Sequence, residues 1–155
     1  MLSDRLVRMI ELHADELTHA LVENLQTNRR TVSYHRLSRE ALHARTYDVY
    51  KNLGLWLSSK VEGDIEAAYT VLGKKRVAEG VPLSELVYAL ILTKYHLRDY
   101  IRSAGLADSA VDLYQEQELH RLLDQFFDKA IYYAVRAYER EACFQEATGA
   151  VKSAR

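Results

Sequence analysis

Apolar residues recur every three or four positions in five segments of this chain, which is the spacing of one face of an α-helix. The stripe is clearest near the N-terminus, where its members are Leu6, Ile10, His13, Leu17, Leu21 and Leu25. The five segments cover residues 4–27, 38–60, 64–79, 82–105 and 109–148. The pattern therefore predicts an all-α chain of about five helices, with a long helix at its C-terminal end.

Polar residues and glycines separate the five segments. Residues 28–37 are polar, and Gly63, Gly80 and Gly105 stand where helices are expected to end. Pro82 suits the first turn of the fourth helix, because that turn needs no backbone N–H from proline. These breaks predict short turns between neighbouring helices.

The expected domain organisation is a single helical domain at residues 1–148, followed by a flexible tail at 149–155. The apolar positions of the last helix span a broad arc, which predicts burial on more than one side. Helices joined by short turns form either a helical bundle or a globin-like stack. The period alone leaves both arrangements open.

Charge and composition narrow the possible partners. The formal net charge is -1, which gives no electrostatic preference for nucleic acid or an anionic membrane. The N-terminus is too charged for a signal peptide, and no apolar run approaches the ~18 residues of a membrane span. Cys143 is the single cysteine, which fits a reducing compartment. We therefore expect a cytoplasmic protein that contacts neither a membrane nor nucleic acid.

Two Glu-x-x-His motifs suggest a di-iron bundle, because residues three apart on a helix can grip one metal pair. They are Glu16 to His19 and Glu40 to His43. Glu16 and His19 fall away from the apolar stripe of the first helix, so we expect them to be solvated. We therefore predict no metal site from these motifs.

Haem binding and nucleophilic catalysis are no better supported by the sequence than the di-iron site. A haem sensor needs an inward-facing histidine, and the histidines placed on predicted helices are His13, His43, His96 and His120. A histidine near an apolar face is more often a hydrogen-bonded boundary residue than a ligand. The Cys143 thiol stands among acidic residues, which disfavour a thiolate. We therefore expect no catalytic residue and no cofactor.

Residues 71–90 read VLGKKRVAEGVPLSELVYAL, and they resemble the pattern R-x-x-x-G-[IV]-P-L-x-E-[LV]-V of RsbR-type co-antagonists, the RsbRD N-terminal domain family. The residues that carry the match are Arg76, Gly80, Pro82, Leu83 and Glu85. Residues 125–139 resemble the closing helix of the same family. Weaker helical similarity extends over residues 5–142.

This resemblance implies a bacterial, stressosome-type input domain that is coupled to an output module or a signalling partner; whether such a domain stands alone or is excised stays open. The segment is also distantly similar to globin-coupled sensors, in which the proximal histidine stands four residues before the glycine. Arg76 occupies that position here, and a guanidinium cannot ligate iron as imidazole does. The resemblance thus implies a globin-like sensor without haem.

The hypothesis for signal transmission is a homodimer in which the long last helix pairs with its copy. The candidate residues of this dimer and transmission helix are Phe126, Phe127, Ile131, Tyr133 and Tyr138. A ligand or partner would shift the helices between two packings of similar energy; any small-molecule ligand is unknown. The alternatives are a haem- or di-iron-binding sensor or enzyme, and an interaction scaffold without a small ligand.

Overall fold

A computed structural model describes the backbone of residues 1–58 and 62–153, with side chains up to residue 149. Within these ranges the chain forms α-helices and one short 3-10 helix, and no strand. The all-α prediction is therefore confirmed. The described residues form seven α-helices, so the prediction of about five was too low, and two expected helices are each divided.

The first expected helix is divided at His13 into α1 (Leu2–Leu12) and α2 (Ala14–Thr27). The backbone of His13 leaves the helical region at φ -104° and ψ 19°, and its Nδ1 lies 2.8 Å from the carbonyl oxygen of Met9. The break lets α1 pack on α7 and α4 while α2 packs on α3 and α6. His13 itself is exposed, although the apolar stripe predicted it on the inward face.

The polar segment 28–37 interrupts the helices as predicted, but it contains the 3-10 helix η1 (Val32–Arg36) and the buried side chains of Thr31 and Tyr34. The Thr31 hydroxyl donates to the carbonyl oxygen of Leu25 at 2.8 Å, which fixes the chain reversal after α2. This segment is therefore an ordered connection that contributes to the core.

The second expected helix, 38–60, is divided into α3 (Arg39–Lys51) and α4 (Leu53–Trp56), and its last residues lie outside the described residues. Ser38 caps α3, because its hydroxyl oxygen accepts from the backbone N–H of Ala41 at 3.2 Å. The division falls at Asn52, whose side-chain amide donates to the carbonyl oxygen of Asp48 at 3.0 Å.

Three longer helices complete the chain: α5 (Glu62–Ala78), α6 (Leu83–Ala104) and α7 (Ala110–Ser153). Gly80 and Gly105 have φ values of +69° and +58°, so the breaks predicted at these two glycines are confirmed. The break predicted at Gly63 was wrong, because Gly63 lies within α5. The third helix was predicted to begin at residue 64, which is too late, because α5 already begins at Glu62. The helix of α7 continues to Ser153, beyond the predicted end near residue 148, and the flexibility of the tail stays a prediction.

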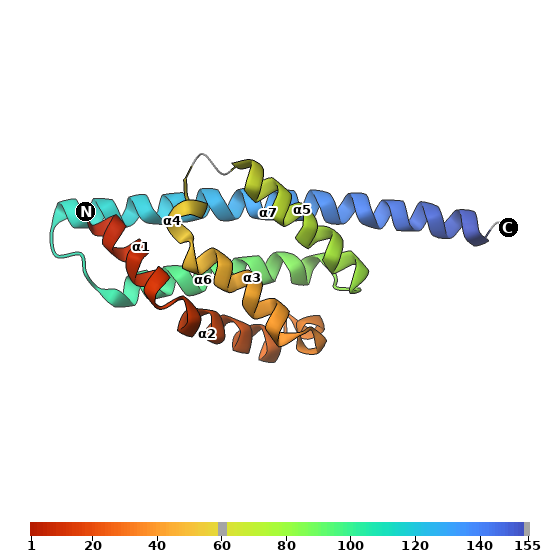
Figure 1. Cartoon of the computed structure of the whole chain (residues 1–155), viewed down its shortest axis with the longest axis horizontal. Helices are drawn as coiled ribbons and strands as arrows, with labels where there is room; N and C mark the ends of the chain where they lie inside the picture. The colour runs from red at the N-terminus through yellow and green to blue at the C-terminus, as the bar shows by residue number, and fades with distance from the viewer. Residues whose placement is uncertain (59–61, 154–155) are drawn as a thin grey trace.

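The helices pack around α7, which runs the full length of the molecule (Figure 1). α5 and α6 both pack on α7, and α2, which packs on α3 and α6, lies farthest from α7. The C-terminal part of α7 projects beyond the other helices (Figure 1). In the part of the chain described, no helix is both long and apolar enough to span a membrane.

Candidate functional site

The turn between α5 and α6 is built by the glycine and proline of the sequence motif. The backbone N–H of Gly80 donates to Val77, and that of Val81 donates to Arg76, both at 3.0 Å. These two bonds form a Schellman motif, which requires the left-handed conformation that Gly80 adopts. Pro82 follows with φ -60° and opens α6. The motif therefore fixes how α5 enters α6.

Arg76 is buried within this turn, with only 4% of its surface exposed. Its Nη1 donates to Glu79 Oε2 at 2.8 Å, and its Nε donates to the Tyr34 hydroxyl at 3.3 Å. The guanidinium carbon also lies 5.1 Å from the centre of the Tyr34 ring. Burial raises the pKa of Tyr34, and the nearby positive charge of Arg76 opposes that rise. Arg76 thus joins α5 to η1.

Glu85 holds η1 from the other side of the turn. Its carboxylate accepts from the backbone N–H of Ser33 at 2.9 Å and from the Ser33 hydroxyl at 2.6 Å. Glu85 lies in the first turn of α6, where its negative charge interacts favourably with the helix dipole. The contact with Ser33 could not be read from the sequence.

The long helix reaches the same turn through Tyr138, whose hydroxyl donates to the carbonyl oxygen of Val81 at 2.6 Å. η1, the α5–α6 turn and α7 therefore meet in one hydrogen-bonded cluster, which we call the Arg76 node. Its members are Ser33, Tyr34, Arg76, Glu79, Val81, Glu85 and Tyr138. Leu83 is half-buried and packs against the core next to this node.

A cavity of about 40 Å³ lies between Arg76 and Arg45. Ligand pockets for cofactors are about 300–1,000 Å³, so this space suits water and not haem. Burial, followed by the charge of Arg76, lowers the pKa of Arg45. None of the six histidines is fully buried. These side chains do not fit an interior haem site.

The aromatic residues expected at the dimer seam contact their own chain. Phe126 and Phe127 are 3% and 0% exposed, and the Phe126 ring packs edge-on against Trp56 and Tyr69. Ile131, Tyr133 and Tyr138 are half-buried against the same core. The burial of the two phenylalanines leaves them no surface for a second copy in this packing.

Three other aromatic side chains of α7 are exposed and were not singled out from the sequence. Tyr114, near the start of the helix, is 68% exposed. Tyr132 is 60% exposed and Phe144 is 66% exposed. Phe144 stands on the part of α7 that follows its last contacts with the core at Ala137 and Tyr138. Only the packing of α5 and α6 on α7 distinguishes these positions from the buried aromatic residues.

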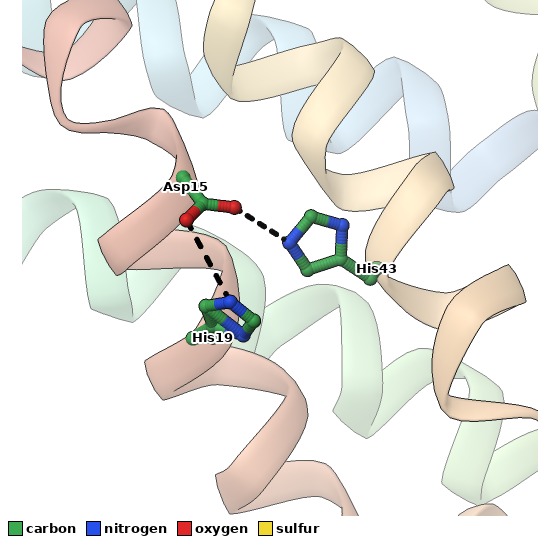
Figure 2. Close-up of side chains that lie close together, drawn as sticks. All are labelled: Asp15, His19 and His43. Carbon is green, nitrogen blue, oxygen red and sulfur yellow. Dashed lines mark hydrogen bonds and ion pairs between the residues drawn. The ribbon is translucent and has the colours of Figure 1, made fainter.

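The two Glu-x-x-His motifs do not form an interior di-iron cage, because Glu16 and Glu40 are both exposed. The solvated position predicted for Glu16 and His19 is thereby confirmed. Their histidines nevertheless meet at the surface between α2 and α3, on either side of Asp15 (Figure 2). Sequence reasoning did not select Asp15 as part of a site.

Asp15 bridges the two imidazoles with its two carboxylate oxygens. Oδ1 lies 3.0 Å from His43 Nε2, and Oδ2 lies 3.6 Å from His19 Nε2 (Figure 2). The centres of the two imidazole rings are 4.8 Å apart. One donor atom from each side chain lies within 4.8 Å of the other two, so this trio, which we call the Asp15 cluster, could hold a metal ion.

The described geometry thus contains a buried motif node and a surface cluster, and no group arranged for nucleophilic attack; Cys143 is exposed on α7. No curated protein and no solved structure matches the chain. A family model does match residues 15–143, and its description is the RsbT co-antagonist protein rsbRD N-terminal domain. This range contains the Arg76 node and all but the first helix and the end of α7. The chain therefore belongs to the RsbRD N-terminal domain family.

Proposed function

We propose that this chain is a non-catalytic bacterial input domain of the stressosome type, globin-like and without haem, which transmits a signal by repacking its helices. The observation that carries the proposal is the Arg76 node. It places the residues of the family motif at a turn where η1, α5, α6 and α7 are hydrogen-bonded together. Membership of a regulatory domain family supports the same function.

The route of transmission is short. A ligand or partner that displaced η1 would act on Tyr34 and Ser33, and through them on Arg76 and Glu85 at the α5–α6 turn. Tyr138 would carry the displacement into α7, since its hydroxyl is bonded to the turn itself. A shift between two packed arrangements of these helices would then move the projecting end of α7.

The projecting end of α7 is the proposed interface with other proteins (Figure 1). We propose that it pairs with a second copy of the chain and contacts a signalling partner or a fused output domain in the cytoplasm. Phe144 supports this role, because an exposed aromatic side chain on a helix is suited to a protein interface. Phe126 and Phe127 would then act inside the domain, by holding α7 to its own core.

A signalling readout tests the function. Cells that carry the wild-type protein should change the activity of a stress-responsive reporter, and the Tyr138→Phe variant should alter that response at an unchanged protein level. Identical reporter activity with the wild-type protein and with the gene deleted would contradict the proposal. Thermal-shift screening separates a sensor from a scaffold, because a ligand of the folded state raises the melting temperature.

The oligomeric state has its own test. Sedimentation of the wild-type protein at micromolar concentration should show a dimer, and Phe144→Glu should shift it toward a monomer. A monomeric wild-type protein would remove the dimer from the proposal and leave the input function standing.

A further inference from the structure

We propose that Asp15, His19 and His43 form a surface site for a divalent transition-metal ion of the zinc class. Two imidazoles and one carboxylate are a ligand set that zinc uses when it keeps a position open for water or another group. The prediction of no metal site concerned an interior di-iron pair held by the two Glu-x-x-His motifs. The carboxylate that joins the two histidines in the folded chain is that of Asp15.

The backbone already places the three donors on facing surfaces. Asp15 and His19 are four residues apart on α2, so their side chains share one face of that helix. His43 comes from α3 and points toward them (Figure 2). In a tetrahedral zinc site with bonds of about 2.0–2.1 Å, neighbouring donors lie roughly 3.3 Å apart. The Asp15–His43 pair is already at 3.0 Å, and the donors span no more than 4.8 Å.

The side chains differ in how firmly they are held. The His43 ring is stacked on Tyr47, with ring centres 5.7 Å apart and planes 16° apart, and its side chain is 26% exposed. His19 is more exposed, so rotation of its side chain can close the remaining gap. His43 would therefore be a ligand held in place by packing, and His19 would be a mobile ligand whose side chain turns toward Asp15 and His43 when the ion binds.

The surroundings leave the fourth position to water and limit the opposing charge. Glu40 stands three residues before His43 on α3 and lines the same surface hollow, and its Oε2 accepts from the Ser38 hydroxyl at 3.2 Å. Arg39 also lines this hollow, but its Nη1 lies 3.1 Å from Glu23 Oε2, which offsets the positive charge. The two carboxylates of Asp15 and Glu40 leave a site suited to a cation.

Metal binding would fasten α2 to α3, the two helices that flank η1. The proposed metal site requires only the Asp15 cluster, and it does not depend on whether the chain is an input domain. A failure of the metal site would therefore leave the proposed function untouched, and the reverse is also true.

Zinc binding to the tag-free full chain, measured by titration calorimetry after chelator treatment, tests the site. We expect one ion per chain with micromolar or tighter affinity, and a rise in melting temperature with added zinc. His19→Ala and His43→Ala should each weaken binding by roughly tenfold or more, since each removes one of three protein ligands. Cobalt should give the visible absorption of a tetrahedral site.

His35→Ala is the matched control, because His35 is an exposed histidine outside the cluster. Its zinc affinity should equal that of the wild-type protein. Circular dichroism of each metal-free variant shows whether it remains folded, and Asp15→Asn retains the size of the side chain if an alanine variant does not fold. Absence of zinc binding in the submillimolar range, or equal losses in His35→Ala and His43→Ala, would overturn the site and leave the cluster as a histidine–carboxylate contact.

Discussion

Gly73 of α5 and Ala134 of α7 approach so closely that a Cβ atom at residue 73 would lie 2.3 Å from the Ala134 carbonyl oxygen. The same Cβ would lie 3.0 Å from the backbone nitrogen of Tyr138. The missing side chain is therefore the reason that α5 can lie directly against α7. This contact holds the Arg76 node next to the helix that projects from the domain (Figure 1).

Replacing Gly73 by Ala should consequently force α5 and α7 apart. We expect the free energy of unfolding to fall by about 1–3 kcal/mol, the usual cost of overpacking, because the obstacle is backbone. Urea denaturation measures the loss. Gly63→Ala is the control: no atom lies within 4 Å of its Cβ position, and the substitution should leave stability unchanged or raise it by up to about 1 kcal/mol. Equal effects of the two substitutions would contradict the close-packing argument.

Arg76→Met should destabilise the domain because two groups would lose their hydrogen-bond donor. The substitution removes the donor to Glu79 and the donor to the buried Tyr34 hydroxyl. We expect a loss of about 2–3 kcal/mol in the free energy of unfolding, below that of a fully buried pair because Glu79 is partly exposed. Arg121→Met provides the comparison, since its pairing with Glu118 is exposed and should contribute little.

The sequence predicted the helical ends that local chemistry determines. Gly80 and Gly105 act through their own backbone conformation, so their roles were visible in the order of residues. The hydroxyl of Ser38 caps α3 by an equally local bond, but it was not singled out from the sequence. The breaks at His13 and Asn52 were missed because neither residue is a strong helix breaker. Each side chain instead bonds a carbonyl oxygen four residues earlier, and the packing of the divided helices stabilises the break.

The candidate sites show the same difference between features set by local sequence and features set by packing. The motif around Arg76 was recognised as a sequence pattern, but its contact with Tyr34 joins positions 42 residues apart. Asp15 and His43 are 28 residues apart and meet only because α2 packs on α3. Helical periodicity gives the face on which a residue lies and does not give the helix that will cover that face.

Ser33 and Glu85 should show measurable coupling in a double-mutant cycle. Ser33→Ala removes the 2.6 Å hydroxyl bond, and Glu85→Ala removes both bonds to residue 33. We expect a coupling energy of about 1 kcal/mol, below the roughly 1.5–3 kcal/mol of a hydrogen bond to a charged group, because Ser33 and Glu85 are only half-buried. Urea denaturation of the two single variants and the double variant provides the numbers. Strictly additive effects would show that Glu85 acts on α6 alone.

The last prediction concerns pH and rests on two half-buried histidines. Burial lowers the pKa of His96 below its ordinary value of 6.5. Burial, followed by the positive charge of Arg98, also lowers the pKa of His120, whose Nδ1 is buried without a partner among the described residues. Glu116 and Asp124 oppose this shift, and Asp99 opposes it at His96.

Because both histidines bind a proton less tightly in the folded state than in the unfolded state, acid favours unfolding. Their stabilising contribution is complete above the ordinary histidine pKa and is lost as the pH falls through the lowered values. We therefore expect the free energy of unfolding to decline between about pH 7 and pH 5, above the range in which carboxylates titrate. Urea denaturation at a series of pH values should show a shallower decline in His96→Gln and His120→Gln, and shallowest in the double variant. A decline as steep in the double variant as in the wild-type protein would assign the acid sensitivity to other groups.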